Sequence, residues 1–388
     1  MSDLKQMMKN KFDENRGLLK EVAIAVGLDS SSTLSKWLDD PRKELADFNV
    51  LVSTVKYLYP DKEYDLISEH SLTLDPKKQA SRQALEYADV NHLGELADRL
   101  IIRLKEAKNA TSNEWAAVYE LHRKLSTGEY SVLQANDRLC GISIKSDEMK
   151  VFSKVMFLYQ YLNKREFNRL DETISYINMD LVEGFSSEYV KNSYRARILM
   201  LKANACLFDR KLEETRKYVN ECLEITDTVR FLAFGYMNMG NTYMFESYDK
   251  AKEFFLKGLE SCQHRDIYKY ELKLSLSFLA NYWGKENKYL AEYSDDADDL
   301  QEIAFWNIKN GNKEKALEIL NSTNKDDLDN FQLAFDSYFR GLITLEKDHF
   351  YDSIEYFILA GDKFYRTAPL IELKKLGESE RSLKIFAM

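Results

Sequence analysis

The stretch RGLITLEKDHFYDSIEYFILAGDKFY, residues 340–365, decides the fold of this chain. Gly341, Ser353, Phe357 and Ala360 follow one another in it at steps of twelve, four and three residues. Small residues at such positions let two antiparallel helices approach closely, and the aromatic ring fills the space beside them. The stretch therefore predicts a helical hairpin.

The same pattern recurs outward from this stretch. A step of twelve joins Ala304 to Ala316 and Ala203 to Thr215, whereas Ala251 in GNTYMFESYDKAKEFFLKGLE comes one position early. These steps are typical of tetratricopeptide repeats, which stack into a right-handed superhelix. We expect helical hairpins at about 151–180, 187–224, 228–262, 268–291, 297–321 and 331–366, and further helices over 82–139.

Composition supports an all-α fold. The chain has 388 residues with 45% apolar and 31% charged side chains, but only 14 Gly and 4 Pro. Such a length exceeds one compact core and favours several domains or a solenoid. We expect a helix-turn-helix domain at 1–60, a linker with degenerate repeats at 61–145, a peptide-binding solenoid of tetratricopeptide type at 146–370 and a C-terminal capping or dimerisation helix at 371–388.

Several classes of protein are disfavoured. No apolar run approaches the roughly 20 residues that span a bilayer, and the N-terminus MSDLKQMMKN has no signal-peptide core, so we expect a cytoplasmic protein without membrane contact. The four cysteines form no C-x-x-C pair, and the five histidines form no H-E-x-x-H motif. Glycine loops for phosphate and a G-x-S-x-G motif are missing too. We expect no catalysis, no metal and no cofactor.

Asparagine recurs at the repeat length. Asn204, Asn241 and Asn281 each follow a small residue, at separations of 37 (241 − 204) and 40 (281 − 241). Equivalent positions of a superhelix line one concave surface, and amide side chains pair with a peptide backbone. Leu207 and Met244 follow one turn later and could pack a guest side chain. The alternative is coincidence in an asparagine-rich chain.

Charge suggests what the groove would bind. Asp336 and Asp362 place carboxylates on the C-terminal repeats, and Arg230 opens a middle one. A peptide with a positive side chain and a free C-terminal carboxylate would match both charges. For the run YSDDADDLQEI we favour a simpler interpretation, in which acidic residues complement a helix N-terminus.

The N-terminal segment LLKEVAIAVGLDSSSTLSKWLDDP has the pattern of a helix-turn-helix, with a turn at Gly27 and a second helix at about 32–38. Residues 1–38 carry six Lys and Arg against five Asp and Glu, so their attraction to DNA phosphates is weak. We therefore expect two copies of this N-terminal segment, the DNA-binding head, to bind together. The start of the second helix would face the DNA with Ser31, Ser32, Thr33, Ser35 and Lys36.

A family resemblance follows from these features. A helix-turn-helix head on a tetratricopeptide body resembles the peptide-pheromone regulators of Gram-positive bacteria. More narrowly, SRQALEYADVN, VYELHRKL, FLANYWGKENKY followed by YSDD, and PLIELKKLG are similar to segments of the AimR arbitrium receptors of temperate Bacillus phages. The resemblance covers almost the whole chain and is weakest in the head.

The resemblance implies a homodimer that binds operator DNA and senses a peptide of about six residues, which sets the choice between lysis and lysogeny. It implies that the peptide-free dimer activates transcription and that peptide binding stops it. It also places the groove asparagines at Asn204 and Asn241, Arg230 at the peptide's C-terminus, and Asp362 at its arginine with Glu302 as a second carboxylate. We expect Gln301 to line the groove as well. Phe208 departs from the family, because a relative has another asparagine there.

The tail ELKKLGESERSLKIFAM carries an apolar stripe of Leu376, Leu383, Ile385 and Phe386. A terminal helix of this kind caps the last repeat or is buried by another chain, and the resemblance favours dimerisation there. Two other functions remain open from the residues alone. One is a peptide-regulated phosphatase or anti-activator, and the other is an adaptor that binds a protein partner without DNA.

Overall fold

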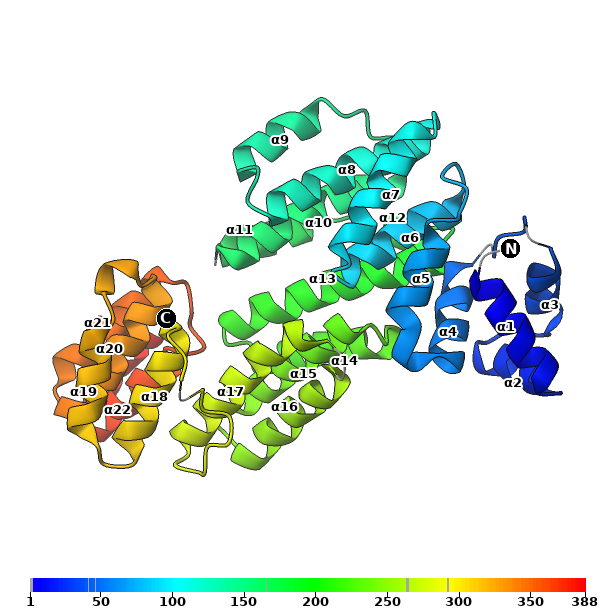
Figure 1. Ribbon diagram of the computed structural model, residues 1–388. Helices are drawn as coiled ribbons and strands as arrows, with labels where there is room; N and C mark the ends of the chain where they lie inside the picture. The colour runs from blue at the N-terminus through cyan, green and yellow to red at the C-terminus, as the bar shows by residue number, and fades with distance from the viewer. Residues whose placement is uncertain (1–2, 41, 46, 165, 263–264, 292) are drawn as a thin grey trace. The chain divides into compact units, whose positions relative to one another are not determined.

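The computed structural model describes residues 3–40, 42–45, 47–164, 166–262, 265–291 and 293–388. Every regular element in these ranges is a helix, which confirms the predicted all-α class (Figure 1). The chain divides into two compact units, residues 1–160 with 176–195 and residues 161–175 with 196–388. Two of the three boundaries fall inside helices, namely within α10 (Asp147–Asn163) and within α13 (Glu188–Phe208), and the third follows the end of α11 at residue 175.

The first unit begins with three short helices and continues with longer ones. Its helices are α1 (Asp3–Glu14), α2 (Leu18–Ala25), α3 (Ser32–Asp39), α4 (Phe48–Leu58), η1 (Pro60–Lys62), α5 (Glu63–Ser71), α6 (Gln79–Val90), α7 (Gly94–Glu106), α8 (Ala110–Ser126), α9 (Val132–Cys140) and α12 (Met179–Glu183). Side-chain caps begin several of them, as where Asp47 accepts from the Asn49 amide at 2.9 Å.

The second unit holds the repeats. Its helices are α11 (Phe167–Ser175), α14 (Leu212–Ile225), α15 (Val229–Tyr243), α16 (Tyr248–Cys262), η2 (Asp266–Tyr268), α17 (Lys269–Tyr282), α18 (Ala297–Lys309), α19 (Lys313–Ser322), η3 (Lys325–Asp327), α20 (Asn330–Thr344), α21 (Lys347–Leu359), α22 (Thr367–Lys375) and α23 (Glu380–Ala387). The pairs α15/α16, α18/α19 and α20/α21 confirm the predicted hairpins at 228–262, 297–321 and 331–366.

Small residues bring the paired helices together, as their spacing predicts. A Cβ built on Gly341 would lie 2.7 Å from the Phe350 ring, and one built on Gly240 would lie 2.5 Å from the Phe255 ring. Both rings are fully buried in one apolar core that runs through the unit. Any side chain at Gly240 or Gly341 would therefore force the two helices of its hairpin apart.

The hairpin predicted at 268–291 is wrong. This segment forms one helix, α17, which ends before Gly284 (φ 61°) and is followed by an irregular loop. The residues KENK after Gly284 offer no apolar face that a second helix could bury. The loop instead brings Asn287 against α17.

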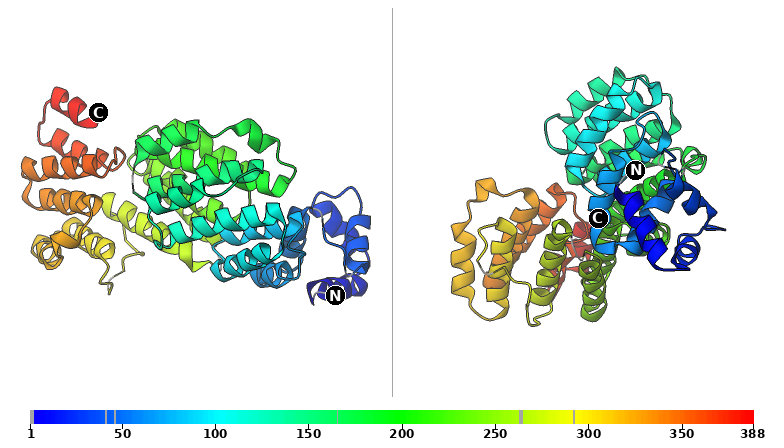
Figure 2. Two further views of the ribbon diagram at one scale, coloured as in Figure 1. Left: turned by 90° about the horizontal axis from the view of Figure 1, so that it is seen from above. Right: turned by 45° about the vertical axis from the view of Figure 1, so that its right-hand side comes forward.

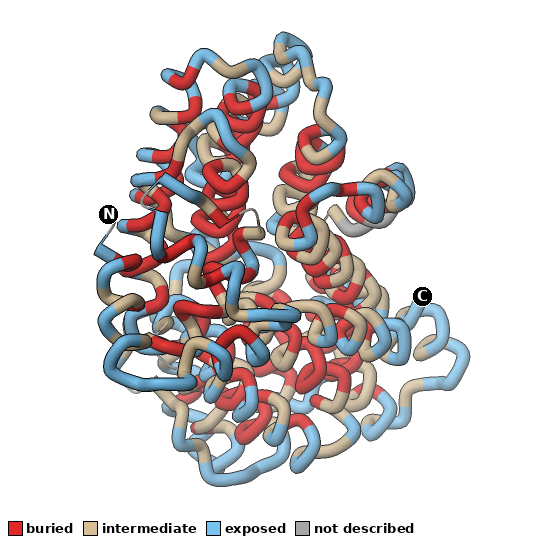
Figure 3. Tube along the Cα trace, turned by 90° about the vertical axis from the view of Figure 1, so that its right-hand side faces the viewer, coloured by how far each residue is buried: buried red, intermediate tan, exposed pale blue. Residues whose placement is uncertain are grey.

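Buried and exposed residues alternate along most of the helices, as expected for stacked amphipathic pairs (Figure 3). The tail helix α23 follows α22 at the end of the stack (Figure 2). Leu376, Leu383 and Phe386 are partly buried against the core of their own chain, and only Ile385 of the predicted stripe is exposed. The tail thus packs against the end of its own chain and keeps part of its surface exposed.

Candidate functional site

The N-terminal helices present a candidate DNA-binding surface. Gly27 adopts a left-handed conformation (φ 77°) between α2 and α3, as a tight helix-turn-helix requires. Ser32, Thr33 and Lys36 of α3 are exposed, and Ser31 and Ser35 are half-buried. Leu34, Trp37 and Leu38 face the interior, so the polar side of α3 is free to meet a ligand.

A buried lysine anchors the end of α3, and the sequence analysis did not identify it. The Lys5 Nζ donates to the backbone oxygens of Asp40 at 2.8 Å and Lys43 at 2.6 Å, and it lies 5.1 Å from the centre of the Trp37 ring. His70 also meets Trp37 edge to face, with 5.8 Å between the ring centres. Burial lowers the pKa of His70 to about 4, so the imidazole is neutral in this stack.

The second unit contains an acidic cavity of about 330 Å³. Four carboxylates line it, those of Glu271, Asp298, Glu302 and Asp329. Five amide side chains line it as well, those of Asn204, Asn238, Asn241, Gln301 and Gln332. No Lys, Arg or His is among its described lining residues. A cavity with this lining suits a ligand that carries positive charge and donates hydrogen bonds.

Apolar rings form the rest of this cavity. They belong to Phe208, Phe278, Phe331, Phe335, Phe339, Phe364 and Tyr365. Phe278, Phe331 and Phe335 each meet Tyr365 with 5.3–5.5 Å between ring centres. Such walls exclude water and strengthen the electrostatic interactions of the carboxylates.

The amide side chains of the cavity differ in whether they have hydrogen-bond partners within the protein. Asn238 donates to the Asn204 oxygen at 3.3 Å, and Asn204 donates to the backbone oxygen of Met200 at 2.9 Å. Gln301 donates to the backbone oxygen of Gln332 at 2.8 Å. Among the described residues, however, the Asn241 Oδ1 has no hydrogen-bond partner although the residue is 93% buried. An unpaired oxygen of this kind is ready to accept an N–H from a ligand.

Glu302 is the buried carboxylate of the acidic cavity. Its Oε2 accepts from the Asn281 Nδ2 at 2.7 Å and from the Ser277 Oγ at 3.0 Å. Burial raises the pKa of Glu302 to about 8, and these two hydrogen bonds oppose the rise. Burial likewise raises the pKa of Glu271 and of Asp298, with repulsion from neighbouring carboxylates adding to the effect.

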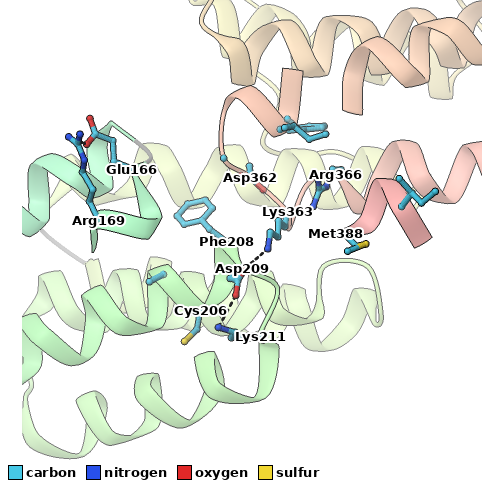
Figure 4. Close-up of a pocket in the computed structure, with 15 residues that line it drawn as sticks. Glu166, Arg169, Cys206, Phe208, Asp209, Lys211, Asp362, Lys363, Arg366 and Met388 are labelled. Atoms are coloured by element: carbon cyan, nitrogen blue, oxygen red, sulfur yellow. Dashed lines mark hydrogen bonds and ion pairs between the residues drawn. The ribbon is translucent and has the colours of Figure 1, made fainter. Parts of the chain in front are cut away.

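A second, larger cavity of about 660 Å³ lies in the same unit and is shown in Figure 4. Its charges are paired with one another: Asp209 lies between Lys211 and Lys363, at 2.8 and 2.7 Å (Figure 4). Glu166 pairs with Arg169 at 2.7 Å. We call it the ion-pair cavity. Phe208 lines both cavities.

The structure brings together six of the ten residues predicted to bind peptide. The six that line the acidic cavity are Asn204, Leu207, Phe208, Asn241, Gln301 and Glu302. Asn281 lies beneath the lining, 1% exposed and bonded to Glu302. Arg230 is half-buried at the start of α15 and does not line the cavity.

Two more of the predicted residues lie outside the lining of the acidic cavity. Met244 follows α15 on the side that faces the core, where it is fully buried, so it offers no surface to a guest. Asp362 lines the ion-pair cavity, because the left-handed Gly361 (φ 71°) ends the helical turn there and lets the Asp362 Oδ1 accept the Tyr365 amide at 2.8 Å. Its carboxylate also opposes the lowering of the Arg366 pKa by burial.

Other classes of site find no support among the described residues. None of their helices combines the length and apolar content needed to cross a membrane. They also contain no group of three or more His, Cys, Asp or Glu side chains placed to bind a metal ion.

Comparisons with known proteins agree with this architecture. A family model described as AimR transcriptional regulator-like matches residues 63–375. An AimR transcriptional regulator of Bacillus phage phi3T is 37% identical over 383 residues, which cover 98% of this chain and 100% of the relative. An AimR transcriptional regulator of Bacillus phage SPbeta is 36% identical over 381 residues, covering 98% of each chain.

Solved structures show the same relationship. The structure of SeMet-phAimR matches with a TM-score of 0.87 and 37% identity, covering 100% of both chains. The structure of phAimR-Ligand matches with a TM-score of 0.76 and 39% identity, covering 87% of this chain and 100% of that one. The chain therefore belongs to the AimR family of transcriptional regulators.

Proposed function

We propose that this chain is a DNA-binding transcription regulator controlled by a short peptide, which the acidic cavity binds. The observation that carries the proposal is the lining of this cavity: four carboxylates, no basic side chain among its described residues, and the unpaired buried oxygen of Asn241. A peptide with an arginine supplies both a cation and backbone N–H groups. The ligand-bound state of a family member supports the presence of a ligand site.

Within this proposal Glu302 takes the peptide's positive side chain. Its burial excludes water, and a guanidinium can donate two parallel hydrogen bonds to one carboxylate. Asn204 and Asn241 take the peptide backbone, and Arg230 meets the C-terminal carboxylate, as the family resemblance implies. Phe208 then offers an apolar contact where a relative has an amide.

The output of the switch is operator DNA. Two copies of the chain pair through their C-terminal helices, so that two heads read a two-fold-related operator in the host cytoplasm. Exposed Ser32, Thr33 and Lys36 of α3, with the half-buried Ser31 and Ser35, supply the contacts. The peptide-free dimer activates transcription for lysis-lysogeny control, and peptide binding switches it off by favouring a second conformation.

Calorimetric titration with synthetic hexapeptides that end in Arg-Gly-Ala tests the binding site. Asn241→Ala should weaken binding about tenfold or more, because a buried ligand N–H would lose its acceptor. Asn310→Ala is the matched control, since Asn310 is an exposed residue whose amide donates only to the Trp306 backbone oxygen at 2.8 Å. Equal peptide affinity of wild type and Asn241→Ala would refute the site. If neither protein gave a heat of binding with the peptides, the proposed function would be refuted.

A further inference from the structure

A hydrogen-bond network lies under the floor of the acidic cavity. The Asn281 Nδ2 donates both to the Glu302 Oε2 at 2.7 Å and to the Glu302 backbone oxygen at 3.1 Å. The Ser277 Oγ donates to the same Oε2 at 3.0 Å. Asn281 and Ser277 both lie on α17, one turn apart, and both are at least 98% buried. They bind the Glu302 side chain but are not among the lining residues of the cavity.

The loop after α17 completes this network. The Asn287 Nδ2 donates to the Asn281 Oδ1 at 3.0 Å and to the Ser277 Oγ at 2.9 Å. The Asn287 Oδ1 accepts the Tyr289 amide at 3.0 Å, which fixes the loop side chain in turn. With its oxygen engaged by Asn287, the Asn281 amide must point its NH₂ group at Glu302. A rotated amide would set oxygen against the carboxylate.

The charges around Glu302 make this orientation matter. Asp298 and Asp299 lie on the same helix, Glu271 lines the cavity from α17, and Asp329 lines it from just before α20. The described lining residues contribute no cation against these acids. Donors from Asn281 and Ser277 favour the ionised carboxylate and so oppose the burial that raises the Glu302 pKa.

We propose that Asn281 and Asn287 are positioning residues that keep Glu302 aimed and ionisable for a cationic ligand, which makes the loop after α17 a determinant of charge selectivity. This inference rests on the proposed function of the acidic cavity. Neither residue lines the cavity, and both act through Glu302. Removing Asn287 frees the Asn281 amide to rotate, and the carboxylate then keeps its proton in the presence of the ligand.

Two hexapeptides separate this role from a merely structural one. They are identical, ending in Arg-Gly-Ala, except that one carries citrulline, the neutral isostere of arginine. Charge selectivity is measured in the full-length protein as the dissociation constant of the citrulline peptide divided by that of the arginine peptide. We expect this ratio to fall about tenfold in Asn281→Ala and about threefold in Asn287→Ala, because an interaction with a charged group is weakened directly in one variant and indirectly in the other.

Asn307→Ala is the matched control. Asn307 lies on α18 with Glu302, is 1% exposed like Asn281, and donates within its own helix to the Ile303 oxygen at 2.9 Å. This variant should lose thermal stability and keep the selectivity ratio of the wild type. A ratio that falls equally in all three variants would show that general loosening of the fold is responsible, and it would overturn the proposal.

The pH dependence of arginine-peptide binding gives an independent readout. In Asn281→Ala the rise of affinity with pH should move to higher pH, since Glu302 has lost a donor that favours its ionised form. An unchanged ratio and pH profile in both variants, with tight peptide binding in the wild type, would overturn the positioning role and leave the site standing. Absence of binding to the wild type would instead remove the proposed function. Asn287 is partly exposed in a loop, so its variant tests the idea even if Asn281→Ala does not fold.

Discussion

The acidic cavity and the ion-pair cavity lie in the same unit and share Phe208, yet they treat charge in opposite ways. In the ion-pair cavity Asp209 lies between Lys211 and Lys363, and Asp362 is accompanied by Arg366. The acidic cavity has four carboxylates and no basic side chain among its described lining residues. One cavity is neutralised by the chain itself, and the other is not.

This difference is the reason why we propose the acidic cavity as the ligand site. Carboxylates that share a confined space without a cation cost stability, and folded chains tolerate that cost at functional sites. The raised pKa values of Glu271, Asp298 and Glu302 express it. By size alone the ion-pair cavity would have been chosen. The pattern of charge pairing favours the acidic cavity instead.

The largest effect should come from Glu302, through the dependence of stability on pH. Its pKa is raised to about 8, so between pH 4.5 and 8 the folded chain binds more protons than the unfolded chain. The stability that this proton provides is present at low pH and is lost as the pH rises toward 8. Relative to wild type, Glu302→Gln should gain about 4 kcal/mol of unfolding free energy at pH 8 and almost nothing at pH 4.5.

Denaturant unfolding of the full chain at several pH values measures this difference. Glu260→Gln, at an exposed position of α16, removes one carboxylate elsewhere and should follow the wild type at every pH. A constant offset between Glu302→Gln and wild type across the range would contradict the assignment of an uncompensated charge to the acidic cavity.

In the ion-pair cavity, removing a carboxylate is expected to lower the free energy of unfolding instead of raising it. Asp362→Ala removes the acceptor of the Tyr365 amide and the carboxylate beside buried Arg366, so it should cost about 2 kcal/mol of unfolding free energy at pH 7. Asp362→Asn keeps an acceptor and should recover part of this loss, which separates the hydrogen bond from the charge. If both variants were as stable as wild type but had lost peptide binding, Asp362 would belong to the ligand site after all.

Much of the fold follows from the sequence because it depends on local spacing. The twelve-residue steps identified the hairpins at 297–321 and 331–366, and the shorter step from Gly240 to Ala251 identified the one at 228–262, since close helix pairs need small residues opposite rings. The segment 268–291 was misassigned for the same reason. Its apolar residues suit one helix. The loop after Gly284 is held by hydrogen bonds of Asn287, and such contacts produce no periodic pattern in the sequence.

The candidate site was only partly predictable. Asn204 and Asn241 share a repeat position and both reach the acidic cavity, whereas Asn281 occupies the equivalent place but turns to Glu302. Asp296 caps α18, as the acidic run suggested, yet Asp298 two residues later lines the cavity. A helix in a stack presents adjacent residues to different neighbours, and the sequence does not show which neighbour each one meets.

Substitutions in a third region, the N-terminal helix-turn-helix segment, should alter DNA binding without affecting either cavity. Replacing Ser35 and Lys36 together by alanine should weaken operator binding about tenfold and reduce its salt dependence by about one phosphate contact. Gel shifts on phage DNA at several salt concentrations would reveal this loss, and calorimetry should give peptide binding equal to that of wild type. Weakened peptide binding would show that the variant disturbs the second unit as well.

The smallest effect concerns Phe208, the side chain that both cavities share. Phe208→Asn replaces an apolar wall by an amide, so the preference of the acidic cavity for a peptide with isoleucine over one with alanine at the same position should fall about threefold. The pairing of Asp209 with Lys211 and Lys363 does not involve the ring, so thermal stability should change far less than in Asp362→Ala. If selectivity stayed the same while stability fell strongly, the ring would serve the ion-pair cavity, and the two cavities could not be treated as separate sites.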